Sequence, residues 1–328
     1  MWLLIVLLVS LASNPAFAGV DKPSAQKASV KAGQKASVKR TDVTKVKRAV
    51  VKVKSRVRDK RVRRSMPTMS AATGNKLQLQ SATVLIVDQR DGHIIYSKNT
   101  GAASPIASIT KLMTAMVTLD ARLPLSEAVT ISTEDIDRLR NTTSRLRVGA
   151  TLSRRQLLQL ALMSSENRAA AALARTYPGG LPGFLVAVNL KAKKLGMDRT
   201  VLVDGTGLNS HNVSTAEDLA KMVSAAYDYP LIRDISTAPS YMLSNPKARK
   251  LEFRNTNMLV KNRDWNIGIS KTGYINEAGH CLVMQAQIAN RPTIIVLLDS
   301  MGKYSRIGDA NRIKKWIEAN KNSVQVAG

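Results

Sequence analysis

Three short strings carry residue types that nucleophilic chemistry needs, and they occur in one order: Ser108-Ile-Thr-Lys111, Ser165-Glu-Asn167 and Lys271-Thr-Gly273. A serine hydroxyl becomes a good nucleophile only when a nearby base takes its proton, and a lysine can act as that base. Ser-x-x-Lys recurs elsewhere in the chain, whereas Lys-Thr-Gly occurs once. The combination and its order therefore indicate a serine acyl-transfer site more strongly than any one string does.

Ser108 and Lys111 lie in a stretch whose apolar residues recur at helical spacing, so their side chains share one face of the predicted helix. The lysine amine is neutral only if its pKa falls from its usual value of about 10.4. Burial and a neighbouring cation both lower a lysine pKa, and Lys271 is the candidate cation. Backbone N–H groups at the helix N-terminus would also stabilise an oxyanion. We therefore expect Ser108 as nucleophile and Lys111 as its base.

The second string offers side chains for proton transfer and binding. Ser165 can relay a proton between Lys111 and a leaving group. The amide of Asn167 can hold Lys111 and a substrate carbonyl together. For Glu166, between these two residues, we expect no catalytic role.

The third string offers groups for binding a substrate. Lys271 and Thr272 supply a cation and a hydroxyl that suit a substrate carboxylate. Gly273 would let a substrate backbone approach the edge of a strand closely.

Hydrophobic patterning predicts the elements that position these strings. Apolar runs at 82–87 and 93–96 flank Asp91-Gly92, which predicts a hairpin. The middle of the chain reads as helices. They are expected from Ser108 to Leu119, after an N-cap at Ser153, over Asn167–Arg175, over Phe184–Leu195, and from a capping box at Ser214-Thr-Ala-Glu217 towards Tyr227.

The last third of the chain returns to strands. They are expected at 265–272 and in a hairpin of 281–288 and 293–298 around Asn290-Arg-Pro292, before a last helix at about 306–320. A sheet built from both ends of the chain around a helical middle is an α+β arrangement.

With these motifs in place, the chain resembles the D-alanyl-D-alanine carboxypeptidase family of serine peptidases, in particular its endopeptidases of the penicillin-binding protein 7 type. The resemblance covers roughly residues 75 to 320, and the intervals between the three strings also fit the family. It rests on the stretches Ser104–Thr114, Leu160–Ala170, Thr206–Asn209 with Asn212–Leu219, and Lys271–Tyr274 with Ala278-Gly279.

The resemblance implies a penicillin-binding protein/β-lactamase-like transpeptidase fold, an antiparallel sheet flanked by helices with a helical subdomain. It implies Ser108 as acyl-enzyme nucleophile, Lys111 as proton acceptor and Ser165 as a third catalytic group. The backbone N–H groups of Ser108 and Tyr274 would form the oxyanion hole, and Arg306 would help to bind a carboxylate. The remaining substrate-binding residues would be Asn167, Lys271, Thr272 and Gly273.

The activity that the resemblance implies is cleavage of D-alanyl peptide cross-links in peptidoglycan, with β-lactams as inhibitors. Carboxypeptidase members add a β-rich second domain, whereas only about 55 residues follow Lys271, which favours the endopeptidase type. The alternatives are a D,D-carboxypeptidase, a serine β-lactamase and a non-catalytic cell-wall-binding protein. A class A β-lactamase would carry a Glu-x-x-Leu-Asn-like string between the second and third motifs, and none is present there.

The N-terminus predicts export. Residues 1–18 are uncharged, rich in Leu, Ile and Val, and end in an Ala-x-Ala cleavage sequence, which is typical of a signal peptide. No Lys or Arg precedes the apolar run, so an uncleaved membrane anchor is the alternative. We expect the protein in the periplasm or cell envelope, with residues 75–328 as the catalytic domain.

Residues 19–74 are predicted to be a basic, low-complexity and disordered tail with a linker. Residues 21–64 hold 17 Lys and Arg against 3 Asp, a net charge of +14 within a total of +27. Such a segment cannot bury enough apolar surface to fold alone. Its expected partner is an anionic envelope polymer or a membrane surface, and an inert spacer is the alternative. Export argues against nucleic acid.

No metal or other cofactor is expected. His93, His211 and His280 lack metal-ligand spacing, and no Gly-x-Ser-x-Gly string is present. Cys281 is the only cysteine, so an internal disulfide is impossible, and we expect it to be a small core residue.

Overall fold

The computed structural model describes residues 77–244 and 250–320 of the 328-residue chain. The chain divides into two units, Met1–Met69 and Ser70–Gly328, and every described residue lies in the second. The predicted signal peptide and most of the basic tail with its linker belong to the first unit. The signal peptide, the tail and the linker all lie outside the described residues. Among the residues described, none of the helices has the length and apolar character that a membrane crossing requires.

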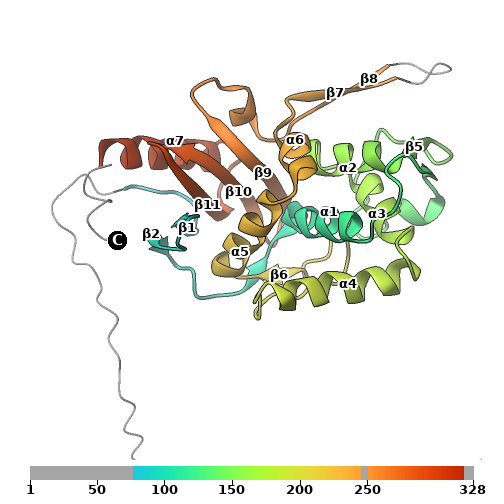
Figure 1. Ribbon diagram of the computed structural model, residues 1–328, viewed down its shortest axis with the longest axis horizontal. Coiled ribbons are helices and arrows are strands. Elements are labelled where there is room, and N and C mark those ends of the chain that lie inside the picture. Colours follow the sequence, from blue (N-terminus) through green and yellow to red (C-terminus); the bar gives the residue numbers. More distant parts are fainter. Residues whose placement is uncertain (1–76, 245–249, 321–328) are drawn as a thin grey trace, which may run out of the picture. The chain divides into compact units, whose positions relative to one another are not determined.

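A five-stranded antiparallel sheet forms one part of the domain (Figure 1). Its strands come from both ends of the folded sequence, which confirms the predicted α+β arrangement. Strand β9 lies at one edge, next to the helical middle. In spatial order the strands are β2 (Ile94–Lys98), β1 (Thr83–Asp88), β11 (Arg291–Ser300), β10 (Gly279–Ile288) and β9 (Asn266–Ile275).

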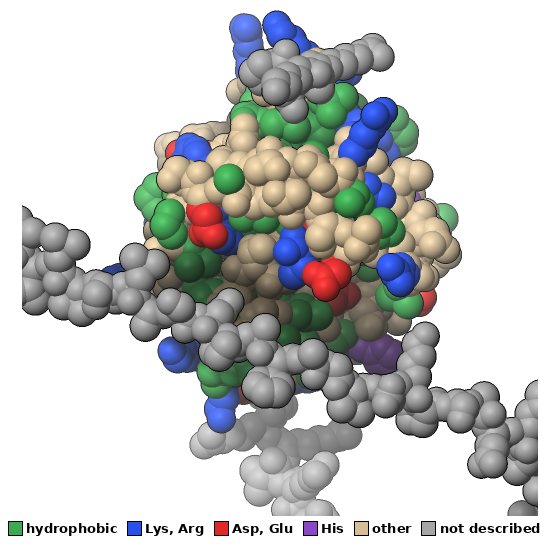
Figure 2. All heavy atoms as spheres, turned by 90° about the vertical axis from the view of Figure 1, so that its right-hand side faces the viewer, with side chains coloured by type: hydrophobic (Ala, Val, Ile, Leu, Met, Phe, Trp, Pro, Cys, Tyr) green, Lys and Arg blue, Asp and Glu red, His purple; other side chains and the backbone are tan. Residues whose placement is uncertain are grey.

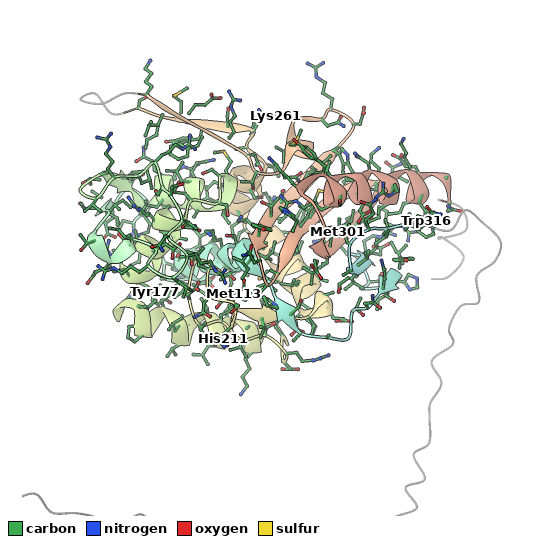
Figure 3. All side chains as sticks on the ribbon, turned by 180° about the vertical axis from the view of Figure 1, so that it is seen from behind. Met113, Tyr177, His211, Lys261, Met301 and Trp316 are labelled. Carbon is green, nitrogen blue, oxygen red and sulfur yellow. The ribbon has the colours of Figure 1, made fainter. Side chains whose placement is uncertain are left out.

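Each face of the sheet has its own hydrophobic core, because successive strand residues point to opposite sides. On one face, Val84 and Leu282 pack with Ile313 of α7. On the other face, Leu85 and Val283 join the larger core that the helical middle supplies. Figure 3 shows this division from behind, with Trp316 on α7 beside the sheet and Met113 among the helices.

The helical middle matches the sequence prediction closely, with helices at each expected place. Helix α6, the short two-stranded pairs and the hairpin of β7 and β8 were not predicted. The helices are α1 (Thr110–Asp120), α2 (Arg154–Met163), α3 (Asn167–Arg175), α4 (Gly180–Lys194), α5 (Ala216–Tyr227), α6 (Pro230–Thr237) and α7 (Lys303–Ala319). The short pairs are β3 (Ser104–Pro105) with β6 (Val213–Ser214), β4 (Ala128–Thr130) with β5 (Thr151–Ser153), and β7 (Ser240–Leu243) with β8 (Leu251–Arg254).

Local signals at the helix ends and turns were partly right. Ser153 caps α2 in a reciprocal capping box with Gln156, as predicted. At α5 the cap is Thr215, whose side chain accepts the N–H of Asp218, and not Ser214, which lies in β6. The β10–β11 turn centres on Ala289-Asn290, both with positive φ, because a tight hairpin turn needs φ values that proline cannot adopt.

The helical end of the domain presents a mixed surface. Figure 2 looks onto the side of α2, α3 and α4, and its basic and acidic side chains are scattered there. The described part of this face therefore shows no continuous basic patch, although the whole sequence has a net charge of +27.

Candidate active site

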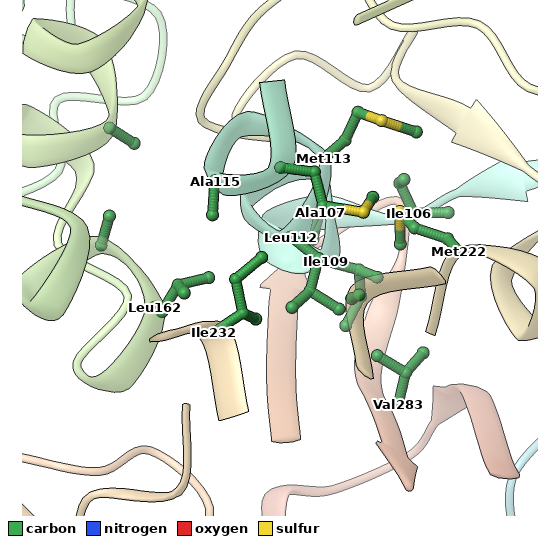
Figure 4. Packing of buried hydrophobic residues seen from close by; sticks show 14 of the residues in the cluster. Ile106, Ala107, Ile109, Leu112, Met113, Ala115, Leu162, Met222, Ile232 and Val283 are labelled. Carbon is green, nitrogen blue, oxygen red and sulfur yellow. The ribbon is translucent and has the colours of Figure 1, made fainter. Parts of the chain in front are cut away.

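Ser108 lies in a short 3₁₀ turn, η1 (Ala107–Ile109), and α1 begins two residues later. The sequence predicted that Ser108 itself would open the helix. Ala107 has a φ of 48°, a left-handed conformation that is unusual for a non-glycine residue. The side chains of Ile106, Ala107 and Ile109 are buried in the core between helices and sheet (Figure 4). The residues around Ser108 are thus anchored, which holds its hydroxyl in one place.

A cavity of about 860 Å³ is lined by Ser108, by residues of β9 and by residues of the helical middle. It brings together residues that the sequence spreads over almost 200 positions. Lys111 and Lys271 are fully buried and do not form part of the wall. The predicted site residues in the wall are Ser108, Ser165, Asn167, Thr272, Gly273, Tyr274 and Arg306.

Lys111 donates hydrogen bonds to three acceptors, which matches the three N–H groups of an ammonium. They are Ser108 Oγ at 2.7 Å, Asn167 Oδ1 at 2.8 Å and the Thr206 carbonyl oxygen at 2.7 Å. A neutral amine can still donate to Asn167 and Thr206, and its lone pair then faces Ser108 Oγ. This geometry allows Lys111 to take the hydroxyl proton of Ser108.

The pKa of Lys111 suits that exchange. Burial lowers the pKa of Lys111 to about 7, against the charges of Asp204 and Glu166, which raise it. Of the two causes that the sequence suggested, burial lowers this pKa, and the Lys271 charge is not among the causes. Near neutral pH both protonation states of Lys111 are therefore populated, as a general base requires.

Lys271 is also buried, but it faces a different partner. Its Nζ donates to Ser165 Oγ at 2.9 Å and to the carbonyl oxygen of Thr272 at 2.8 Å. Burial, followed by the charges of Lys111 and Arg306, lowers the pKa of Lys271 well below its usual range. The structure therefore places Lys271 behind Ser165, and not in the wall where a substrate carboxylate would meet it.

Ser165 occupies the junction of α2 and α3 in a left-handed conformation, with a φ of 60°. Such strain in a non-glycine residue persists only where the surrounding structure imposes it. Within the described residues, Lys271 is the hydrogen-bond partner of the Ser165 hydroxyl, and no bond joins that hydroxyl to Lys111. A proton relay from Lys111 through Ser165 therefore needs a bound substrate or water to complete it.

Gly273 serves the packing of β9 as well as the access that the sequence predicted. A Cβ at this position would lie 2.9 Å from the Ile106 carbonyl oxygen and 3.2 Å from Ser108 N. The absence of a side chain therefore lets the strand lie against the nucleophile's backbone. Tyr274 follows directly, so the two backbone segments predicted to form the oxyanion hole face each other. The Tyr274 ring stacks on His280 with ring centroids 4.3 Å apart.

Thr272 and Arg306 both line the cavity, and both already have protein partners. Thr272 Oγ1 donates to Thr256 Oγ1 at 2.7 Å. Arg306 Nη1 donates to the carbonyl oxygens of Gly273 and Cys281. The Nε of Arg306 is buried without a hydrogen-bond partner.

The loop that carries Thr206 has no role predicted from the sequence, although it completes the surroundings of Lys111. The Asp204 carboxylate accepts the backbone N–H groups of Thr206, Gly207 and Asn209 and so shapes the loop. Gly207 has a φ of 78°, and a Cβ there would lie 1.9 Å from the Ala107 carbonyl oxygen. The Asp-x-Thr-Gly string is visible in the sequence. The group that accepts the Lys111 hydrogen bond, however, is the backbone carbonyl of Thr206, and every residue type has such a carbonyl.

Three other predictions concern groups outside the chemistry. Glu166 accepts a hydrogen bond from the Ser144 hydroxyl and does not line the cavity. Cys281 is buried, and burial raises the pKa of its thiol to about 11, so it stays protonated. Within residues 77–244 and 250–320, no group of three or more His, Cys, Asp or Glu side chains is arranged to hold a metal ion.

Known proteins are similar to this chain in sequence and in fold. The chain matches the model of the D-alanyl-D-alanine carboxypeptidase family, peptidase family S11, over residues 68–302. It is 49% identical over 254 residues to the D-alanyl-D-alanine endopeptidase of Pseudomonas aeruginosa, and 49% identical over 256 residues to that of Escherichia coli. Each match covers 77% of this chain and 82% of the relative.

A solved structure matches as well. The Streptomyces K15 DD-transpeptidase superposes with a TM-score of 0.67 and 27% sequence identity, over 73% of this chain and 97% of that chain. The predicted transpeptidase-like fold is thereby confirmed.

Proposed function

The chain belongs to the D-alanyl-D-alanine carboxypeptidase family of serine peptidases, and we propose from this premise that it is an endopeptidase cutting D-alanyl peptide cross-links in peptidoglycan. The two relatives that share 49% of their aligned residues with it carry the endopeptidase name. One observation carries the chemistry: a buried lysine with a pKa of about 7, its Nζ 2.7 Å from Ser108 Oγ at the cavity wall.

The first half of the reaction forms an acyl-enzyme. Ser108 Oγ attacks the D-alanyl carbonyl carbon while neutral Lys111 takes the hydroxyl proton. The backbone N–H groups of Ser108 and Tyr274 stabilise the oxyanion of the tetrahedral intermediate. The C–N bond then breaks, the leaving amine takes up a proton through the Ser165 hydroxyl, and an ester to Ser108 remains. Water hydrolyses this ester in the second half, with Lys111 again as base.

The substrate is held from both walls of the cavity. The amide of Asn167 meets the acyl side while it also accepts from Lys111. Thr272 and the Arg306 guanidinium, both in the cavity wall, bind the carboxylate of the leaving group. Lys271 contributes indirectly, because its bond to Ser165 Oγ keeps that hydroxyl in place.

A D,D-carboxypeptidase is the main alternative, since the family as a whole carries that description. Digestion of purified cross-linked and uncross-linked muropeptides, followed by chromatography and mass spectrometry, separates the two functions. We expect wild type to convert cross-linked dimers to monomers and Ser108→Ala to leave them intact. Release of D-Ala from uncross-linked stems with dimers untouched would reject the endopeptidase function. Retained activity in Ser108→Ala would reject the serine mechanism.

β-Lactams should acylate Ser108, because their strained amide offers the same carbonyl. A fluorescent penicillin should label wild type stably and leave Ser108→Ala unlabelled. Rapid turnover of a chromogenic cephalosporin would instead indicate a β-lactamase. The absence of any phenotype from Ser108→Ala in cells would indicate a binding protein.

Export and a tethering role for the basic tail complete the proposal. The apolar start with its Ala-x-Ala sequence and the net charge of +14 at 21–64 support them. N-terminal sequencing of protein from the cell envelope should find cleavage after Ala18, whereas an intact Met1 would indicate a membrane anchor. Full-length protein should sediment with purified cell walls or anionic vesicles at low salt, and a chain beginning at residue 75 should not.

A further inference from the structure

An ion pair links a residue of the cavity wall, Arg140, to Glu277, which directly follows the wall residues Ile275 and Asn276. Arg140 Nη2 donates to both carboxylate oxygens of Glu277, at 2.9 and 2.8 Å. Arg140 belongs to the loop between η2 (Thr133–Asp135) and β5, in the helical middle of the chain. Glu277 lies in the β9–β10 turn, two residues beyond the end of β9. The two partners are 137 residues apart in the sequence, so the contact is a purely tertiary bridge.

Arg140 reaches a third segment as well. Its Nε donates to the carbonyl oxygen of Leu208, in the same loop that presents Thr206 to Lys111. One guanidinium thus connects the Arg140 loop, the 204–209 loop and the β9–β10 turn.

The loop that carries Arg140 is itself held firmly. The Asp137 carboxylate accepts the N–H groups of Leu139, Arg140 and Thr142, and these bonds lower the pKa of Asp137 although burial raises it. Thr142 Oγ1 in turn accepts a hydrogen bond from Asn167 Nδ2 at 3.0 Å. The bridge is therefore anchored on one side to the residues that hold Lys111.

The position of the Arg140–Glu277 bridge determines which substrates are long enough to reach it. Strand β9 is an edge strand, so a peptide backbone can lie along it within the cavity. At about 3.3 Å per residue, a chain that extends roughly three residues beyond Tyr274 reaches the level of Glu277. A small β-lactam ends before this point. A cross-linked peptide continues on both sides of the scissile bond, so one of its arms must run towards the bridge.

We propose that Arg140 and Glu277 form a clasp that makes this site selective for substrate length. The closed clasp leaves acylation by short substrates unhindered and must open for a peptide arm that leaves the cavity past Ile275. The proposal rests on the proposed function for the identity of the long substrate, a cross-linked peptidoglycan peptide. The exposure of the Glu277 side chain, 47%, leaves the pair accessible to solvent ions, so the clasp can open at low cost.

The test compares wild type with Glu277→Gln, which removes the charge and keeps the size of the side chain. An exposed ion pair of this kind limits the effect to roughly two- to fivefold. We expect kcat/KM for a cross-linked muropeptide dimer to rise by that factor, mainly through a lower KM, and the acylation rate of a small penicillin to stay unchanged. Glu318→Gln is the matched control, since Glu318 forms an ion pair of similar exposure with Lys314 on α7.

The salt dependence of activity gives a second readout. The ratio of Glu277→Gln to wild-type activity on dimers should approach one as NaCl rises from ~0.05 to ~0.5 M, because ions screen the exposed pair in wild type. A charge-independent packing effect of the substitution would leave this ratio constant and would overturn the clasp.

The remaining outcomes are separable. Equal changes towards penicillin and dimer in Glu277→Gln, a lower kcat/KM for dimers, or no change at all would each overturn the clasp. Wild type that cuts no dimers would overturn the proposed function. In that case an uncross-linked pentapeptide stem replaces the dimer as the long substrate. If Glu277→Gln then changed kcat/KM for the stem and the acylation rate of penicillin by the same factor, the clasp would be overturned as well.

Discussion

Two buried lysines lie at the centre of this protein, one on the helical side and one on the sheet edge, and their surroundings give them different chemistry. Lys111 has three acceptors from three separate segments, and Asp204 and Glu166 raise a pKa that burial lowers to about 7. Lys271 is buried near the positive charges of Lys111 and Arg306, and its pKa lies well below the usual range. The difference indicates that Lys111 exchanges a proton near neutral pH, whereas Lys271 acts as a hydrogen-bond donor that positions Ser165.

The largest expected effect tests the base. Lys111→Ala should reduce the acylation rate by a fluorescent penicillin by roughly 10³- to 10⁴-fold, because Ser108 loses its proton acceptor. Lys111→Arg should be equally inactive, since a guanidinium stays protonated. Substantial activity in Lys111→Arg would show that the position needs a positive charge and not a base.

A smaller effect tests the positioning role of Lys271. Lys271→Met should lower the acylation rate by roughly 10²-fold, a loss of the size seen when one preorganised donor is removed. Because Lys271 acts through Ser165, the double variant Lys271→Met/Ser165→Ala should be little worse than Ser165→Ala alone. Additive losses in this double-mutant cycle would show that Lys271 meets the substrate directly, as the sequence first suggested.

The smallest effect is a shift in the midpoint of the pH profile, and it sharpens the contrast between the lysines. Neutral Lys111 is the active form, so the acylation rate should fall about tenfold per pH unit below a midpoint near its pKa of about 7. Glu166 raises this pKa, so Glu166→Gln should lower it and move the acid limb of the profile to lower pH. Rate profiles from pH 5 to 9 check this, with Glu318→Gln as the control. A midpoint that does not move in Glu166→Gln would remove Lys111 as the titrating base.

Local patterns predicted the elements well and their contacts poorly. The helix at Asn167–Arg175 and the first hairpin follow from periodicity and turn residues, which act over a few positions. Ser108 was placed in a helix because the 3₁₀ turn before α1 has no pattern of its own. The missed elements, such as α6 and the β7–β8 pair, are short and carry weak periodicity.

The sequence alone determined the chemical inventory of this protein: a serine and a lysine one helical turn apart, a Ser-x-Asn, and a single Lys-Thr-Gly. Residue type and short-range spacing are sufficient for that. Only the tertiary structure decided which lysine faces which serine, how far burial lowers each pKa, and that Arg140 bridges the cavity to Glu277. These properties depend on distances and desolvation between segments far apart in the chain, which no local pattern encodes.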